Sequence, residues 1–161
     1  MTFNQLVKDI ENSKEFKEYK GKKVLYSAFF TLRKAQSKII EDFGQLNYWT
    51  GGKNCVVFSA LNNIEFKEDT IEEKKVKEFT DLKKDIKFDI DKLIELLDKK
   101  LKGEVSKILV VLQKINQKQV WNITAILTTL EMYRIKIDMD GKILEDKKQD
   151  ITDMIRIKKK K

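Results

Sequence analysis

Histidine, the side chain most often used as a general acid or base, is absent from this chain of 161 residues. There is therefore no Ser-His or Cys-His nucleophile pair, and the commonest general base and metal ligand is missing. Cys55 is the single cysteine, which excludes a disulfide within these residues and a Cys/His zinc cluster. It lies in the apolar run CVVF, where we expect a buried, unreactive thiol rather than a reactive one.

Carboxylates are the remaining residues that could do chemistry. Asp138, Asp140 and Glu145 surround an Asp-Gly turn and could hold a cation through oxygen ligands. A calcium loop needs more ligands at fixed spacing, so we interpret these residues as turn formers. No two carboxylates can be placed in a common cleft from the sequence, and Gly51-Gly52-Lys53 is not a complete phosphate loop. We predict no catalytic residue, metal or cofactor and a protein that is not an enzyme; an enzyme without histidine is a further hypothesis.

Aromatic residues are the candidate contact residues. Trp49 and Trp121 are the largest side chains in the chain, and they occupy matched positions in its two halves. Together with Tyr48 and Tyr133 they could line a groove or contact a partner. For the two tryptophans we favour packing against the helices, because a tryptophan buries a large area.

Charge is abundant but mixed. The net charge is +8 and 37% of residues are charged, while 41% are hydrophobic, which is enough for a core. Lysines alternate with acids in every helix-like segment, and only residues 158–161 form an uninterrupted basic run. The N-terminus has no signal-peptide pattern, and the longest clean apolar run, residues 108–112, is too short to span a membrane. We expect a cytoplasmic protein without membrane contact.

Periodicity predicts which elements position these residues. An amphipathic helix is expected over residues 3–20, interrupted near Ser13, and a second one over 89–102, opened by Asp89 and ended by Gly103. Residues 70–88 are either partly helical or an extended connector. Strands are expected at the following ranges: 24–32, 46–50, 55–60, 64–67, 105–112, 119–127, 132–139 and 143–147.

The clearest pattern runs from Gln119 to Lys147. In residues 119–127, Trp121, Ile123, Ala125 and Leu127 share one face, and Val120, Asn122, Thr124 and Ile126 share the other. Asp140-Gly141 is a strong hairpin signal, and a two-residue loop there would place Ile137 opposite Leu144.

The two halves show the same order of elements, a helix followed by strands, with a tryptophan in the second strand of each. This order predicts an α+β fold of two pseudo-repeated units, each a helix packed on a three- to four-stranded antiparallel sheet. The predicted units are 1–69 and 89–157, joined by a charged connector, 70–88, and followed by a lysine tail, 158–161.

The second half resembles the PepSY domain, a small helix-on-sheet unit close to the cystatin-like folds. The resemblance covers residues 89–147, mainly a strand with an aromatic start and a strand of the form v-x-v-D-x-x-x-G-k-v, although this chain has two residues rather than three between the Asp and the Gly. The matching residues are Trp121, Ile135, Ile137, Asp138, Gly141, Lys142 and Ile143. The resemblance implies a binding module that acts on other proteins, and it carries no catalytic residues across.

The sequence thus predicts a non-catalytic protein-binding or scaffold module with an unidentified protein partner. The alternative is a weak, sequence-independent nucleic-acid-binding protein that uses its lysine-rich surface. Pairing of an exposed edge strand with another copy is a further possibility for oligomer formation.

Overall fold

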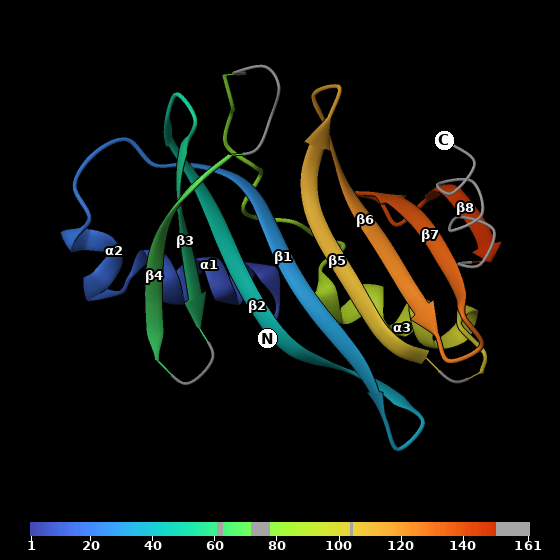
Figure 1. Ribbon diagram of the computed structural model, residues 1–161. Helices are drawn as coiled ribbons and strands as arrows, with labels where there is room; N and C mark the ends of the chain where they lie inside the picture. The colour runs from blue at the N-terminus through green and yellow to red at the C-terminus, as the bar shows by residue number, and fades with distance from the viewer. Residues whose placement is uncertain (61–62, 72–77, 104, 151–161) are drawn as a thin grey trace, which may run out of the picture.

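The computed structural model describes residues 1–60, 63–71, 78–103 and 105–150. Within them the chain forms three short helices and one eight-stranded antiparallel sheet with strand order β4-β3-β2-β1-β5-β6-β7-β8 (Figure 1). The elements are α1 (Phe3–Glu11), α2 (Lys14–Glu18), β1 (Val24–Ala35), β2 (Lys38–Gly51), β3 (Asn54–Ala60), β4 (Ile64–Thr70), α3 (Ile90–Lys100), β5 (Val105–Ile115), β6 (Lys118–Leu127), β7 (Glu131–Asp138) and β8 (Ile143–Asp150). The lysine tail at 158–161 and the end of the predicted second unit, 151–157, lie outside the described residues.

The antiparallel strands and the α+β character are confirmed, but the predicted pair of separate helix-on-sheet units is wrong. β1 and β5 pair antiparallel from Ser27 opposite Gln113 to Leu32 opposite Ile108, so both halves form one continuous sheet. The reason is physical: the first strand of each half would otherwise be an edge with unpaired N–H and C=O groups. When β1 pairs with β5, the backbone N–H and C=O groups of both edges form hydrogen bonds with each other.

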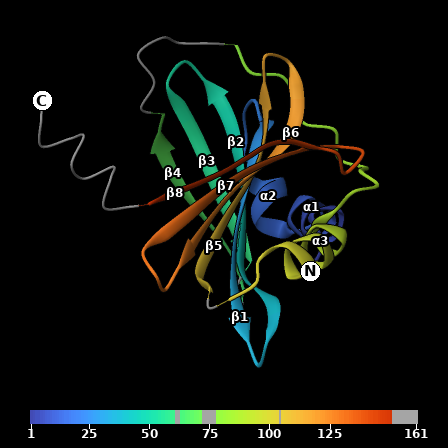
Figure 2. The same cartoon turned by 90° about the vertical axis from the view of Figure 1, so that its right-hand side faces the viewer.

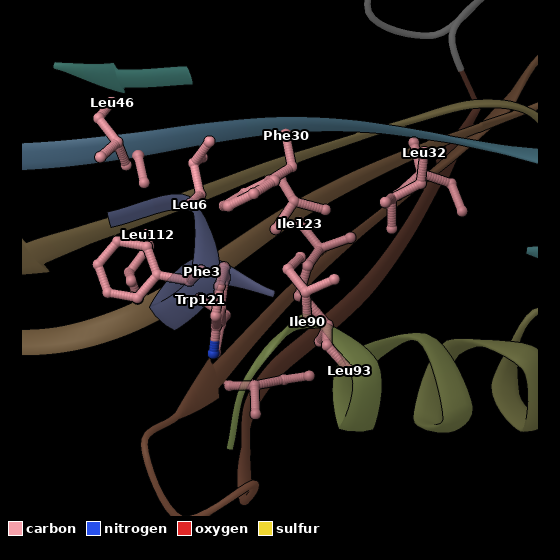
Figure 3. Packing of buried hydrophobic residues seen from close by; sticks show 14 of the residues in the cluster. Phe3, Leu6, Phe30, Leu32, Leu46, Ile90, Leu93, Leu112, Trp121 and Ile123 are labelled. Carbon is pink, nitrogen blue, oxygen red and sulfur yellow. The ribbon is translucent and has the colours of Figure 1, made fainter. Parts of the chain in front are cut away.

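All three helices lie on the same face of the sheet (Figure 2). Alternate residues of the central strands point to that face and form one buried core with α1 and α3 (Figure 3). Phe30 of β1 and Trp121 of β6 meet there with ring centroids 6.1 Å apart, so the core crosses the boundary between the two halves. The predicted inward face of β6 is confirmed, since Trp121, Ile123, Ala125 and Leu127 are all buried.

The helices begin where polar side chains can accept from their first N–H groups. The Thr2 hydroxyl accepts from the Gln5 N–H, and the Ser13 hydroxyl accepts from the Phe16 N–H, which confirms the predicted break before α2. Asp89 caps α3 as predicted. Its buried carboxylate also accepts from the Phe3 and Asn4 N–H groups at 2.7 and 3.0 Å, so one side chain joins the N-termini of α1 and α3.

Residues 78–89 form an extended connector, not a helix; residues 72–77, where the helical alternative also ran, lie outside the described residues. Phe79 packs on the rings of Tyr26 and Trp49 on the helix-free side of the sheet. Leu82 and Ile86 are buried in the core on the other side. The connector therefore passes around the end of the sheet from one face to the other.

The β7–β8 turn forms at the predicted place with a different register. Ile137 lies opposite Ile143, not Leu144, and the Asp138 N–H donates to the Lys142 carbonyl. The loop thus holds three residues rather than two. The Asp138 carboxylate accepts from the N–H groups of Asp140 and Lys142, and Gly141 adopts a φ of +88°, which together favour the longer turn.

Candidate functional site

The face of the sheet opposite the helices carries a regular array of side chains. Three rows cross β2, β1, β5 and β6 in perfect register. The twelve residues, which we name the central panel, are Asn47, Ser27, Gln113 and Val120 in the first row, Gln45, Phe29, Val111 and Asn122 in the second, and Phe43, Thr31, Leu109 and Thr124 in the third. Ten of the twelve are half-buried, and Ser27 and Val120 are buried.

The central panel contains no charged residue, although 37% of the chain is charged. Its polar members are amides and hydroxyls. The Asn47 amide donates to the Ser27 hydroxyl at 2.7 Å, and the Gln45 amide donates to the Asn47 oxygen at 3.2 Å. Phe29, Val111 and Leu109 form the apolar middle. The panel is therefore an uncharged surface that offers both apolar contact and hydrogen-bond donors and acceptors.

Charged side chains begin on β7, the strand that follows β6 at one side of the central panel. On β7 and β8, Lys136 and Lys147 both approach Glu145 at 3.4 Å, and Arg134 lies opposite Lys147 in the register. These two lysines hold the pKa of Glu145 below its usual range, Lys147 having the larger effect. On the other side, β3 carries the uncharged Val57 and Ser59 beside the first two rows, and charges appear one strand further out, at Lys67 and Glu65 of β4. The uncharged surface therefore continues onto β3 and ends at charged residues on β4 and β7.

A cleft opens where the connector meets the first row of the panel. Its volume is about 360 Å³, and it lies between Phe79 of the connector and Tyr26, Ser27 and Gln113 of the sheet. The Lys114 amino group donates to the Thr80 hydroxyl and the Asp81 carbonyl, which holds this part of the connector in place. The cleft extends the panel toward the end of β5.

The structure does not bring the four predicted contact residues together. Trp121 and Tyr48 are buried in the core on the helix side, where the Trp121 indole donates to the Phe88 carbonyl and the Tyr48 hydroxyl donates to Glu11. Trp49 is buried near the helix-free face, with Lys22 over its ring at 4.4 Å. Tyr133 is half-buried on the helix side, beside Lys148. Packing against the helices, the interpretation favoured for the two tryptophans, describes Trp121.

The sequence alone indicates the outward face of only one of the four strands of the panel, β6. The second face of β6, with Val120, Asn122 and Thr124, was visible in the alternation. For the first strand, residues 24–32, no outward face is predicted. A signal did exist there: Ser27, Phe29 and Thr31 alternate with Ala28, Phe30 and Leu32. What the sequence could not supply was the β1–β5 pairing that places these residues beside Leu109, Val111 and Gln113.

Two of the three candidate oxygen ligands, Asp138 and Glu145, are engaged in folding contacts. The Asp138 carboxylate closes its own turn, and Glu145 pairs with lysines. Across the described ranges there is no group of three or more Cys, Asp or Glu side chains that could hold a metal ion. In the same part of the chain, no helix is long and apolar enough to cross a membrane.

No protein-family model matches this chain, and no curated protein matches it in sequence. Its fold is similar to that of a putative lipoprotein from Clostridium difficile 630, known from a crystal structure. The TM-score is 0.59 and the identity 16%, with 92% of this chain and 93% of that chain covered. At this identity the similarity shows a shared fold alone.

Proposed function

We propose that this protein is a non-catalytic binding module and that its contact surface for a protein partner is the central panel. The observation that carries the proposal is the exclusion of charge from twelve neighbouring positions on a helix-free sheet face, with charged residues beyond them on β7 and, past the uncharged β3, on β4. Protein interfaces have this composition, because charges are depleted at the desolvated centre and retained at the wet rim. The partner that fits is a folded protein whose contact patch is uncharged at its centre.

The same composition favours a protein over a nucleic acid. Phosphate backbones are bound by clustered Lys and Arg, and the panel has neither. Binding of nucleic acid by the lysine-rich surface stays an untested alternative. A protein partner is also what the PepSY resemblance of residues 89–147 implies, and that resemblance likewise stays a prediction.

The cellular location of this protein, which determines where its partner is found, is also untested. The sequence predicts a cytoplasmic protein, whereas the structure with the similar fold belongs to a putative lipoprotein. Fractionation of native cells with an antibody against this chain decides where the partner must be sought.

Site-specific photo-crosslinking in native cells tests the proposed surface. A benzophenone amino acid replaces Gln45 or Asn122 in the panel, and Lys8 or Lys92 on the exposed side of the helices serves as the matched control. The expected result is one adduct from both panel positions that neither control gives. Equal adducts from both sets, or none, would overturn the proposal.

The protein identified in this way is then purified and titrated against designed variants. Val111→Lys places a charge in the middle of the panel, and we expect it to weaken binding by at least about tenfold. Asn122→Lys is the substitute if Val111→Lys does not fold. Glu95→Lys on the exposed side of α3 adds the same side chain and should bind like the native protein. Unchanged affinity of both panel variants for the partner would contradict the assignment of the central panel as the contact surface.

A further inference from the structure

Leu130 lies at the tip of the β6–β7 hairpin and is unusual in two independent ways. Its backbone has a φ of +64°, a left-handed conformation that a bulky side chain rarely adopts because Cβ crowds the carbonyl. Its side chain is 60% exposed, the highest value among the large hydrophobic residues of the described chain. Both the left-handed backbone conformation and the exposure to solvent are unfavourable for a leucine at this position.

The other hairpins show what this chain ordinarily places in such turns. The left-handed positions are occupied by small, amide or hydroxyl residues: Gln36, Ser37, Gly51, Gly52, Asn116, Gln117 and Gly141. Asn and Gly tolerate this conformation at low cost, and polar side chains suit a solvated turn. Among the left-handed residues that the structure describes, Leu130 is the single apolar one.

Folding of the turn does not require this side chain. The turn is closed by the Leu130 N–H donating to the Leu127 carbonyl at 3.2 Å, a backbone contact that almost any residue could make. Residues in strained backbone conformations cluster at functional sites, including sites that clamp a ligand. The tip follows directly on the pair Ile126 and Met132, which continues β6 and β7 beyond the third row of the central panel.

We propose that Leu130 is a contact residue for the protein bound at the central panel and that it inserts into an apolar pocket of that partner. The inference rests on the proposed function. It adds that the interface extends from the panel to the β6–β7 tip, and that the partner presents an apolar pocket opposite this tip.

Replacement of Leu130 by asparagine separates a binding role from a structural one. Leu130→Asn relieves the backbone strain and removes the exposed apolar side chain, so the unfolding midpoint should rise by a few degrees. Affinity for the purified partner should fall by at least about tenfold. Leu130→Met should retain the affinity. Leu144→Asn, at another exposed leucine, 48% exposed and without a positive φ, should alter neither quantity.

The crosslinker placed at Leu130 gives the second readout, compared with the one at Asn122. The same adduct from both positions supports the inference. An adduct from Asn122 alone, with unchanged affinity of Leu130→Asn, overturns this inference and leaves the proposed function standing. No adduct from either position overturns both.

Two further results would assign the tip to another occupant and overturn the inference. One is an adduct from Leu130 whose mass is twice that of this chain, which indicates a second copy. The other is sedimentation of the native protein with phosphatidylcholine–phosphatidylglycerol vesicles that Leu130→Asn abolishes, which indicates a lipid surface.

Discussion

The carboxylate of Asp89 joins the N-termini of α1 and α3. This carboxylate is buried and accepts from three backbone N–H groups, those of Phe3, Asn4 and Ile90, at distances between 2.6 and 3.0 Å. The N-terminal ends of α1 and α3 both face it, and their dipoles favour a negative charge there. One carboxylate therefore satisfies donors from two helices that are distant in the sequence.

Asp89→Ala should destabilise the protein severely. It leaves three N–H groups without their acceptor in a buried place, and we expect a loss of roughly 2–5 kcal/mol in the free energy of unfolding. Urea denaturation followed by circular dichroism measures it. Asp91→Ala, at an exposed position in the first turn of α3, is the control and should cost much less. Equal losses for the two variants would contradict the role assigned to Asp89.

Cys55 should be a slow thiol. Burial raises the pKa of the Cys55 thiol; a hydrogen bond with Tyr26 lowers it in part, and the nearby Asp69 carboxylate raises it further. A raised pKa means less thiolate at a given pH, and the thiolate is the reactive form. At a pH of about 8, near the ordinary thiol pKa, the native protein should react with a disulfide reagent much more slowly than glutathione does. In denaturant the two rates should converge, and a fast native reaction would contradict this prediction.

At the scale of elements, the connector that includes residues 78–89 forms hydrogen bonds with strands from both halves at one end of the sheet. The Leu82 N–H donates to the Leu25 carbonyl of β1. Lys83 exchanges two hydrogen bonds with the side chain of Gln119 on β6, at 2.7 and 3.0 Å. One connector thus contacts the first strand of the first half and the second strand of the second half, and it forms one wall of the cleft beside the panel.

Gln119→Ala should loosen the connector locally. The Lys83 amide loses its acceptor, so its hydrogen exchange should become about five- to tenfold faster, which corresponds to one hydrogen bond. The Leu82 amide should keep its protection, because its acceptor is in the backbone of β1. Lys118→Ala, at the exposed neighbouring position, is the control. Acceleration at both amides would mean that the connector opens as a unit.

At the scale of the whole molecule, the β1–β5 pairing and the Phe30–Trp121 contact join the two halves through one sheet and one core. We expect a shared core of this kind to unfold in one step, because neither half keeps its burial without the other. The remaining sheet edges are β4 and β8, and pairing of these edges between copies stays a prediction.

The two tryptophans report on this cooperativity, since each half contains one. In Trp49→Phe the fluorescence follows the second half, and in Trp121→Phe it follows the first. Within each variant, the urea midpoint from fluorescence should coincide with that from far-ultraviolet circular dichroism. Separate midpoints in either variant would show that the halves unfold independently.

The sequence by itself determined the local structure. Thr2, Ser13 and Asp89 mark helix starts, and the alternation in β6 identifies its inward face, because caps and strand periodicity depend on neighbours within a few residues. The sequence also excluded Ser-His and Cys-His nucleophile pairs, a disulfide within these residues and a Cys/His zinc cluster. The predicted register of the β7–β8 hairpin was wrong for a local reason. An Asp-Gly pair suits both a two-residue and a three-residue loop, and the hydrogen bonds accepted by the Asp138 carboxylate favour the three-residue loop.

The tertiary structure alone decided everything that depends on pairing distant strands. Two four-stranded halves become one sheet because β1 and β5 satisfy each other's open edges, a contact between residues some 80 positions apart that no local pattern encodes. That pairing buries Trp121 beside Phe30 and so removes it from the candidate contact residues. It also assembles Phe29, Val111 and their uncharged neighbours into the central panel, a surface that exists only once four strands from both halves lie side by side.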